Sequence, residues 1–309
     1  MKGSTHLAAK RYKAANKCLR FTAAAPVSLR DTQQNGSDGS DRRQHIGSLL
    51  KPPLKWAGGK RWLLPHLAPL WRPHASKRYV EPFCGGLAAP LGLRPERALL
   101  NDINPHLINF YKELRHGLNM TVPMRNEEAS FYAHRSRFNE LIRERNYSSA
   151  EAAQLFYYLN RTCFNGLCRF NQSGEFNVPF GQHKSITYAT DFSNFPVLLQ
   201  NWTFTNSDIE SLTVDSEDFI YADPPYDVEF TTYSAGGFSW EDQVRTAEWL
   251  AAHPGPVVLS NQATPRIVQL YRKLGFKIRY LDGPRRISCK GDRSAAREVL
   301  ATRGLTGAA

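Results

Sequence analysis

The sequence has 309 residues, of which 41% are hydrophobic, and its formal net charge at pH 7 is +12. This length permits one large or two modest domains, and this composition excludes a chain that is disordered throughout. No apolar run approaches the roughly 18 residues that span a bilayer, so we expect no membrane segment. Five cysteines without a C-x-x-C pair favour a reduced, intracellular protein.

The positive charge favours a polyanionic partner such as nucleic acid, with an anionic membrane surface as the alternative. Residues 1–50 contain nine Lys or Arg and three acids, which is half of the net excess. The stretch Asn35–Gln44 is rich in Gly, Ser and Asp and is typical of a linker. We therefore expect a basic, disordered leader over residues 1–50 rather than a cleaved transit peptide, with ordered structure from about Leu50.

Short apolar runs predict strands, and segments with a helical period predict helices. The expected strands are Tyr79–Phe83, Ala98–Asn101, Trp202–Thr205, Phe219–Ala222, Val257–Ser260 and Lys277–Leu281. The expected helices are Arg61–Leu70, Pro105–Arg115, Glu128–Arg145, Ala150–Asn160, Trp240–Ala251 and Pro265–Leu274. This alternation favours a parallel doubly wound sheet. It fails between about Gly117 and Ser185, which indicates an insertion between two halves of one sheet.

The first candidate motif, KWAGGK at residues 55–60, sets an aromatic ring and cations around two glycines. Such a segment can lay an indole beside an amino-acid-like ligand while a lysine meets its carboxylate. Taken alone, it also suits a helix-entry turn with solvated lysines.

The second motif, EPFCGG at residues 81–86, is the end of an expected strand that runs into a glycine turn. The next expected strand ends in Asp102, about twenty residues later. In an open α/β sheet the glycines let the backbone approach a ligand, and such an acid holds a ribose diol. The alternative is a tight strand-to-helix turn with a surface acid. A phosphate loop is disfavoured, because the sequence has no G-x-x-x-x-G-K-[ST].

The expected insertion contains a glycine-bearing loop in which cations, amides and an aromatic ring are combined. Its candidates for DNA contact are Arg161, Phe164, Asn165, Arg169, Asn171 and Lys184. Arginine pairs well with guanine and asparagine with adenine, and an aromatic ring can fill the gap left by a flipped base. The alternative is a set of solvated loop residues with one core phenylalanine.

The last motif is YADPPY at residues 221–226, directly after an apolar run. Two consecutive prolines have no N–H for a sheet ladder, so the strand must stop at Asp223. By itself the motif also suits a rigid turn without chemistry.

In this order the motifs resemble those of the Dam-like (D12 class) DNA adenine-N6 methyltransferases, from about Pro53 to about Leu300. The likeness also covers residues 160–169 and 174–181, Ser260-Asn261, and residues 285–288. The resemblance implies a Rossmann-like, S-adenosylmethionine-dependent methyltransferase fold, which is a mixed α/β sheet with an inserted small helical target-recognition domain. We expect the catalytic domain at 51–117 and 186–309 and the recognition domain at 118–185.

The resemblance implies S-adenosylmethionine as methyl donor and no metal. Its donor-binding positions would be Trp56 and Lys60 at the methionine end, Phe83 and Gly85 in the turn, Asp102 at the ribose, Asp208 near the adenine, and Asp223 between donor and target. The match at Asp208 is looser. Family members often have a third small residue in the glycine turn, where this chain has Leu87.

The resemblance also implies double-stranded DNA as the partner, with a GATC-like sequence as the target. It further implies a monomer in the cytoplasm of a prokaryotic cell or of a phage-infected host. Phe164 would be the wedge, Asn165 its phosphate partner, and Leu167, Arg169 and Pro179 would contact base edges.

The DPPY turn suits amine methylation for a physical reason. If Asp223 and the Pro224 carbonyl accept the two amine hydrogens of adenine, the nitrogen lone pair points at the donor methyl. Proline fixes φ, so this carbonyl is aimed in advance, while Pro225 stiffens the turn and Tyr226 offers a stacking face. Three alternatives stay open: N4 methylation of cytosine, methylation of RNA adenine, and a non-catalytic DNA-binding relative.

Overall fold

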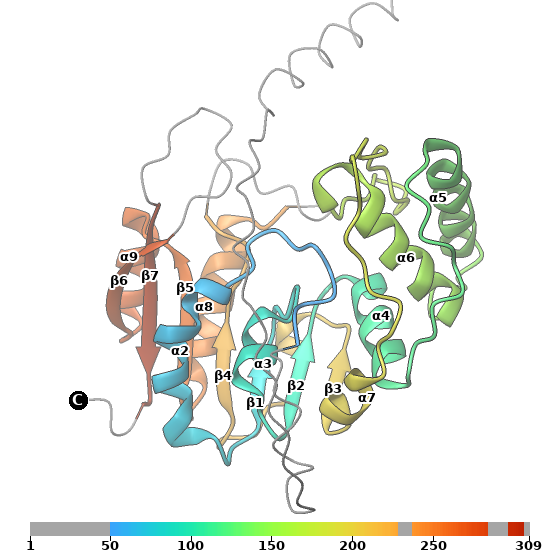
Figure 1. Ribbon diagram of the computed structural model, residues 1–309. Helices are drawn as coiled ribbons and strands as arrows, with labels where there is room; N and C mark the ends of the chain where they lie inside the picture. The colour runs from blue at the N-terminus through green and yellow to red at the C-terminus, as the bar shows by residue number, and fades with distance from the viewer. Residues whose placement is uncertain (1–49, 228–236, 284–295, 306–309) are drawn as a thin grey trace, which may run out of the picture. The chain divides into compact units, whose positions relative to one another are not determined.

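The computed structural model describes residues 50–227, 237–283 and 296–305 (Figure 1). Apart from Asp282, Gly283 and Ala296, these residues belong to one structural unit. The predicted leader up to residue 49, its linker at 35–44 and the motif at 285–288 lie outside the described ranges.

The described chain forms one seven-stranded mixed sheet. Its strands are β1 Tyr79–Glu81, β2 Ala98–Asn101, β3 Trp202–Thr205, β4 Phe219–Ala222, β5 Val257–Gln262, β6 Lys277–Gly283 and β7 Ala296–Arg303. Their order across the sheet is β3-β2-β1-β4-β5-β7-β6. The first five of these are parallel to their neighbours, and β7 is antiparallel to β5. The mixed, Rossmann-like sheet that the resemblance implied is therefore confirmed.

One strand differs from what the sequence pattern predicted. The pattern favoured a wholly parallel sheet of six strands and contained no signal for β7. This strand inserts antiparallel between β5 and β6, with Val257 opposite Arg303 and Gln262 opposite Glu298. The stretch AREVLATR mixes charged and apolar residues, because only its middle is buried.

The six predicted helices are present with small shifts at their ends. They are α2 Leu64–Trp71, α4 Pro105–Arg115, α5 Glu128–Arg143, α6 Ala150–Thr162, α8 Trp240–Ala252 and α9 Pro265–Lys273. Side-chain oxygens of Asn104, Ser149, Ser239 and Thr264 accept backbone N–H groups at the first turns of four of them. Two short helices, α3 Ala88–Leu93 and α7 Asn194–Leu199, were not predicted, since six residues are too few to display a period.

Alternate residues of the central strands enter two hydrophobic clusters, one on each face of the sheet. In β4, Phe219 and Tyr221 belong to the cluster that includes residues of α2, α3 and α4, whereas Ile220 and Ala222 belong to the one covered by α8 and α9. A strand that is buried on both faces reads as a continuous apolar run, which is why β4 was predictable.

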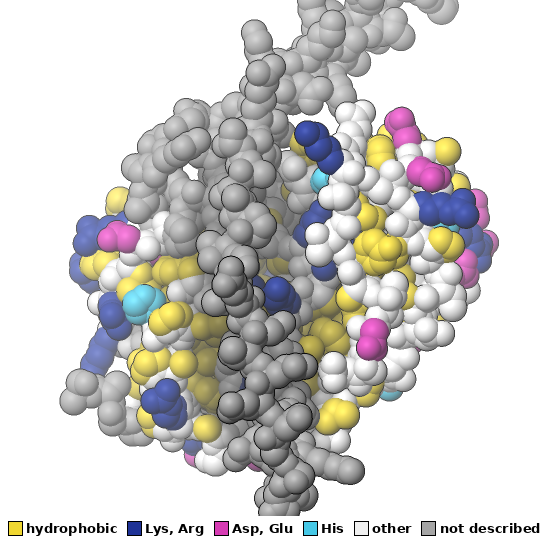
Figure 2. Space-filling view, in the orientation of Figure 1, with side chains coloured by type: hydrophobic (Ala, Val, Ile, Leu, Met, Phe, Trp, Pro, Cys, Tyr) yellow, Lys and Arg dark blue, Asp and Glu magenta, His cyan; other side chains and the backbone are white. Residues whose placement is uncertain are grey.

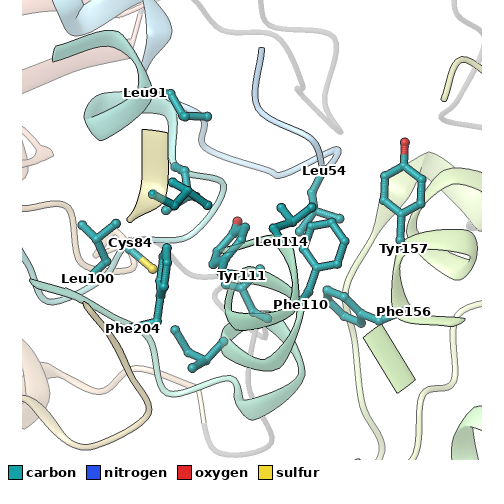
Figure 3. Close-up of a cluster of buried hydrophobic side chains, with 14 of the residues drawn as sticks. Leu54, Cys84, Leu91, Leu100, Phe110, Tyr111, Leu114, Phe156, Tyr157 and Phe204 are labelled. Atoms are coloured by element: carbon teal, nitrogen blue, oxygen red, sulfur yellow. The ribbon is translucent and has the colours of Figure 1, made fainter. Parts of the chain in front are cut away.

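The first cluster continues from α4 into residues 118–185 (Figure 3). Phe110 of α4 stacks on Tyr157 of α6 with ring centroids 5.6 Å apart. Residues 118–185 contribute no strand to the sheet, and α5 packs on α6. The domain boundaries at 118 and 185 stay a prediction. None of the helices in the described ranges is both long and apolar enough to cross a membrane.

Candidate active site

The strand order reverses at β1, which lies between β2 and β4. In such sheets ligands bind beyond the carboxyl ends of the strands on either side of the reversal. The EPFCGG turn follows β1, Asp102 follows β2, and Asp223 follows β4. The structure thus brings three separately predicted motifs to one edge of the sheet, and β4 ends at Ala222 as the prolines required.

The glycine turn after β1 is shaped around the indole of Trp56. Gly85 has a φ of +43°, and a Cβ on it would lie 2.8 Å from Trp56 Nε1. A Cβ on Gly86 would lie 2.7 Å from Trp56 Cβ. Both distances are too short for a side chain, so the two glycines allow KWAGGK to rest on EPFCGG. The Tyr111 hydroxyl donates to the Gly85 carbonyl at 2.6 Å and fixes the turn from α4.

Leu87, where this chain departs from the family pattern, directly follows the two glycines of the turn. Its φ is 60° and its ψ is 27°, so it adopts the left-handed conformation that glycine accepts more easily. That conformation costs a non-glycine residue about 1 kcal/mol. The side chain is fully buried in the first hydrophobic cluster, and this burial offsets the strain.

Asp102 presents a carboxylate at the end of β2. Its oxygens accept N–H groups from Gly85 at 3.1 Å and from Asn104 at 3.0 Å. Burial raises the pKa of Asp102 to about 6, although these two hydrogen bonds oppose the shift. A carboxylate has about four acceptor positions, so both oxygens keep one for a ligand hydroxyl. The residue therefore fits a ribose diol.

The DPPY turn, predicted to be catalytic, begins at Asp223, which is held by two side chains. Ser260 of β5 donates its hydroxyl to Asp223 Oδ1 at 2.8 Å, and Lys60 Nζ lies 3.2 Å from Oδ2. The same Nζ donates to the Gly58 carbonyl at 3.0 Å and lies 4.3 Å from the centre of the Tyr226 ring. Lys60, predicted at the methionine end of the donor, therefore also contacts the predicted catalytic acid.

The Tyr226 ring is anchored by a residue that the sequence did not reveal. Its hydroxyl donates to Glu298 Oε2 at 2.5 Å. Burial raises the pKa of Glu298, against the opposing effects of the Tyr226 hydrogen bond and of Lys60. Because β7 was not predicted, no signal in the sequence pointed to Glu298.

A buried polar chain fixes the middle of the turn. Gln243 of α8 donates to the Pro225 carbonyl at 2.7 Å. Asn261 of β5 donates to Gln243 Oε1 and to the Tyr271 hydroxyl, at 3.0 Å each. The Pro225 carbonyl is therefore held by a polar chain that runs through α8, β5 and α9.

Beyond the turn, Asp227 attaches the chain to α9. It accepts a hydrogen bond from Thr264 Oγ1 at 2.9 Å and forms a two-point ion pair with Arg266. The Arg266 guanidinium lowers the pKa of Asp227. The DPPY turn is thus held at both of its ends.

Asp208 lies after β3 and caps the short 3-10 helix Ile209–Ser211 by accepting the Glu210 N–H. Both of its oxygens accept hydrogen bonds from Arg245 of α8 at 2.8 Å, and this pairing lowers its pKa. Phe83, in the glycine turn, packs edge-on against Phe238. Arg245 was not predicted, because its partner is distant in sequence.

The predicted recognition loop is closed by bridges within itself and is attached to α5, where Asn139 exchanges two hydrogen bonds with the Phe176 backbone. Isolated bridges join Cys163 to Phe180 and Phe170 to Phe176. The half-buried Phe164 donates its N–H to the Pro179 carbonyl at 2.9 Å. Pro179 and Leu167 are half-buried as well.

The residues predicted to contact DNA divide into two groups. Asn165 and Arg169 are exposed, Asn165 with a φ of 55° and Arg169 bonded to Asn177 at 2.8 Å. Arg161 instead donates to the Pro53 carbonyl at 2.6 Å, and Asn171 accepts the N–H groups of Ser173 and Glu175. These last two contacts stabilise the protein itself.

The sheet order and the motifs at the carboxyl ends of β1, β2 and β4 fit the class of Rossmann-like methyltransferases. Comparison with known proteins identifies the family. Residues 56–287 match the family model of the D12 class N6 adenine-specific DNA methyltransferases. The chain is 33% identical over 315 residues to the DNA N-6-adenine-methyltransferase of Escherichia phage P1. This alignment covers 94% of the chain but only 41% of the phage protein.

Two shorter relatives align over most of their own length. The Retron Ec67 DNA adenine methylase of Escherichia coli is 33% identical and the alignment covers 81% of the chain and 90% of that protein. A DNA adenine methylase of Vibrio cholerae is 35% identical, with coverage of 80% and 94%. The chain therefore belongs to the D12 class N6 adenine-specific DNA methyltransferase family, and the predicted family and enzyme class are confirmed.

Proposed function

We propose that this chain transfers a methyl group from S-adenosylmethionine to the N6 amine of an adenine flipped out of duplex DNA, within a GATC-like site. The observation that carries the proposal is the position of Asp223. It ends β4 beside the glycine turn of β1, and Ser260 and Lys60 hold its carboxylate.

Three residues would hold the ribose and the methionine end of the donor. Asp102 would accept the ribose hydroxyls, for which both of its oxygens keep an acceptor position. Trp56 and Lys60 would meet the methionine end. An ammonium has three donors, and those of Lys60 reach Gly58 and Asp223, which leaves one for a ligand carboxylate. When bound, S-adenosylmethionine supplies an electrophilic methyl group on a sulfonium.

Asp208 would accept from the adenine of the donor. Its pairing with Arg245 keeps the carboxylate ionised and oriented, and the remaining acceptor positions suit an amine.

The target amine is a poor nucleophile, because its lone pair is delocalised into the base. Asp223 and the Pro224 carbonyl would accept its two hydrogens and draw the nitrogen toward tetrahedral geometry. Flipping the base costs a few kcal/mol, and stacking on Tyr226 would recover about 1–3 kcal/mol. Asp223 would take the released proton late, since the amine is too weakly acidic to lose it first.

Recognition of the target would come from the loop of residues 163–181. The exposed Arg169 would read a base edge, Phe164 would fill the gap of the flipped base, and Asn165 would bind a phosphate. Arg161 and Asn171 would support this loop, given their bonds within the protein.

The test is incubation of the protein with labelled S-adenosylmethionine and an unmethylated plasmid, followed by nucleoside analysis and mapping of the modified positions. We expect N6-methyladenine at one recurring short sequence. N4-methylcytosine would replace the proposal with the cytosine alternative. Binding of donor and DNA without any modified nucleoside would indicate a non-catalytic relative, and modification of RNA alone would shift the substrate class.

A further inference from the structure

The net charge of the chain is divided between segments of opposite sign. Residues 51–264, which contain every predicted catalytic, donor-binding and recognition residue, hold 20 Lys and Arg against 22 Asp and Glu. Residues 265–309 hold 11 against 3, a net charge of +8. The segment that starts at α9 therefore carries the positive charge beyond the leader.

Most of these cations surround one exposed edge of the sheet, on both of its faces, and we call this region the basic edge. It consists of Arg272, Lys273, Lys277, Arg279, Arg297 and Arg303, from α9, β6 and β7, and all six are exposed. Asp282 is the exposed acid among the described residues of these three elements. Dark blue side chains line the left margin of Figure 2, over β6 in Figure 1.

An exposed aromatic ring lies within the basic edge. The Arg297 guanidinium lies 4.2 Å from the centre of the Tyr280 ring, and Arg272 donates to the Tyr280 hydroxyl at 3.5 Å. Lys277 and Arg279 alternate with Tyr280 along β6 and therefore face the other side of this edge strand. Neither has an ion-pair partner among the described residues, so both charges are available to an external anion.

The basic edge continues from the catalytic turn. Arg297 directly precedes Glu298, which bonds Tyr226, and α9 begins where Arg266 holds Asp227. Two strands separate β6, with Lys277 and Arg279, from β4, so β6 lies about 14 Å from β4 at about 4.8 Å per strand. That distance is about four base pairs of DNA at 3.4 Å each. The predicted recognition loop lies toward the opposite side of the sheet, beside α4.

We propose that the basic edge binds the phosphate backbone of duplex DNA about four base pairs or more from the target adenine, on the side away from residues 118–185. This inference rests on the proposed DNA substrate. It assigns a second contact region, without sequence preference, in which Lys277 and Arg279 pair with phosphates and Tyr280 with its arginines packs on the backbone. A duplex leaving the catalytic turn in that direction meets this surface first.

The test compares two duplexes that carry a GATC site, one with three base pairs and one with fifteen on each side. Binding is measured against salt concentration for the wild type and for the double variant Lys277→Glu, Arg279→Glu. Each lost phosphate contact lowers the salt slope by about 0.9. We expect the variant to bind the long duplex about tenfold more weakly with a shallower slope, and to bind and methylate the short duplex like the wild type.

A matched control reverses two exposed cations outside the basic edge, in the variant Arg72→Glu, Lys112→Glu. It should retain the wild-type slope despite the same change in net charge. The milder Lys277→Gln, Arg279→Gln should give about half of the loss and guards against misfolding, which melting curves report.

Equal slopes for the double variant and the wild type on the long duplex would overturn the inference, as would equal losses on both duplexes. Binding of wild type, but not the variant, to phosphatidylserine vesicles with unchanged DNA slopes would assign the basic edge to a membrane surface instead. If the wild type methylates neither duplex, the proposed function fails, whereas the binding comparison still tests the basic edge.

Discussion

The catalytic turn and the recognition loop are both irregular segments, but they are held in different ways. The turn at Asp223–Tyr226 is fixed from outside by Lys60, by β5, by α8 and by β7. The loop at 163–181 is bridged internally and is also attached to α5, because Asn139 exchanges two hydrogen bonds with the Phe176 backbone, whereas its exposed Arg169 bonds to Asn177 within the loop. The proposed chemistry therefore depends on contacts from several elements, whereas the proposed reading side chain of Arg169 can be changed without removing a contact to another element.

The largest expected effect comes from removing the carboxylate of the turn. Asp223→Ala should lower the methylation rate by about a hundredfold or more, because the amine loses an acceptor aimed in advance. The affinity for target DNA should stay within a few fold, as measured by titration. Turnover like that of the wild type would remove Asp223 from the mechanism.

The exposed Arg169 of the recognition loop is predicted to read one base pair of the target. Arg169→Ala should weaken discrimination at one base pair by about 1–3 kcal/mol while sparing the rate on the best site. Methylation rates on single-base variants of the mapped site measure this. The exposed Arg145, changed to alanine, is the control, and an unchanged preference for Arg169→Ala would refute its reading role.

The third prediction concerns the support of the turn. Gln243→Leu leaves the Pro225 carbonyl without its buried donor, which should cost about 1–3 kcal/mol of unfolding free energy. We expect kcat to fall about tenfold with KM little changed, because the DPPY turn loses its fixed orientation while the substrate still binds. Gln269→Leu, at an exposed position of α9, is the matched control. A loss of stability with kcat intact would reduce Gln243 to a structural role.

The smallest expected effect is a pH dependence at the donor end. Asp102 has a pKa of about 6, so it loses its charge as the pH falls through 6. Donor affinity should weaken a few fold from pH 7.5 to 5.5, as seen by calorimetry, and Asp102→Asn should bind weakly without this inflection. The sign for stability is opposite: a raised carboxyl pKa means that the folded state gains stability as the pH falls from about 6 toward 3.8.

Sequence reasoning predicted the parts of this molecule whose signals are local. The strands β2, β3 and β4 and the capped helix α4 matched their predicted ends. Burial on both faces leaves a continuous apolar run in β2 and β4, the edge strand β3 alternates buried and more exposed residues, and a side-chain cap marks the start of α4. The expectation that Trp56, Asp102 and Asp223 meet around one donor came from the family resemblance, and the parallel strands explain why Asp102 and Asp223 lie at the same edge of the sheet.

The contacts that sequence reasoning missed all join distant segments. Glu298 lies on an antiparallel strand with mixed polarity, and Gln243 and Arg245 lie on a helix whose period says only which face is buried. A sequence pattern gives a residue its face but not its partner. For the same reason it could not separate Arg161, which binds Pro53, from the exposed Arg169.

The place of β7 has a consequence for how the enzyme is made. It is the latest of the described strands in the chain, yet it lies between β5 and β6 and carries the carboxylate that receives the Tyr226 hydroxyl. During translation β5 and β6 are synthesised first, and the edges that later pair with β7 stay unpaired until β7 has been translated. The nascent protein should therefore become active in a single step, when β7 pairs with β5 and β6, and not gradually during elongation.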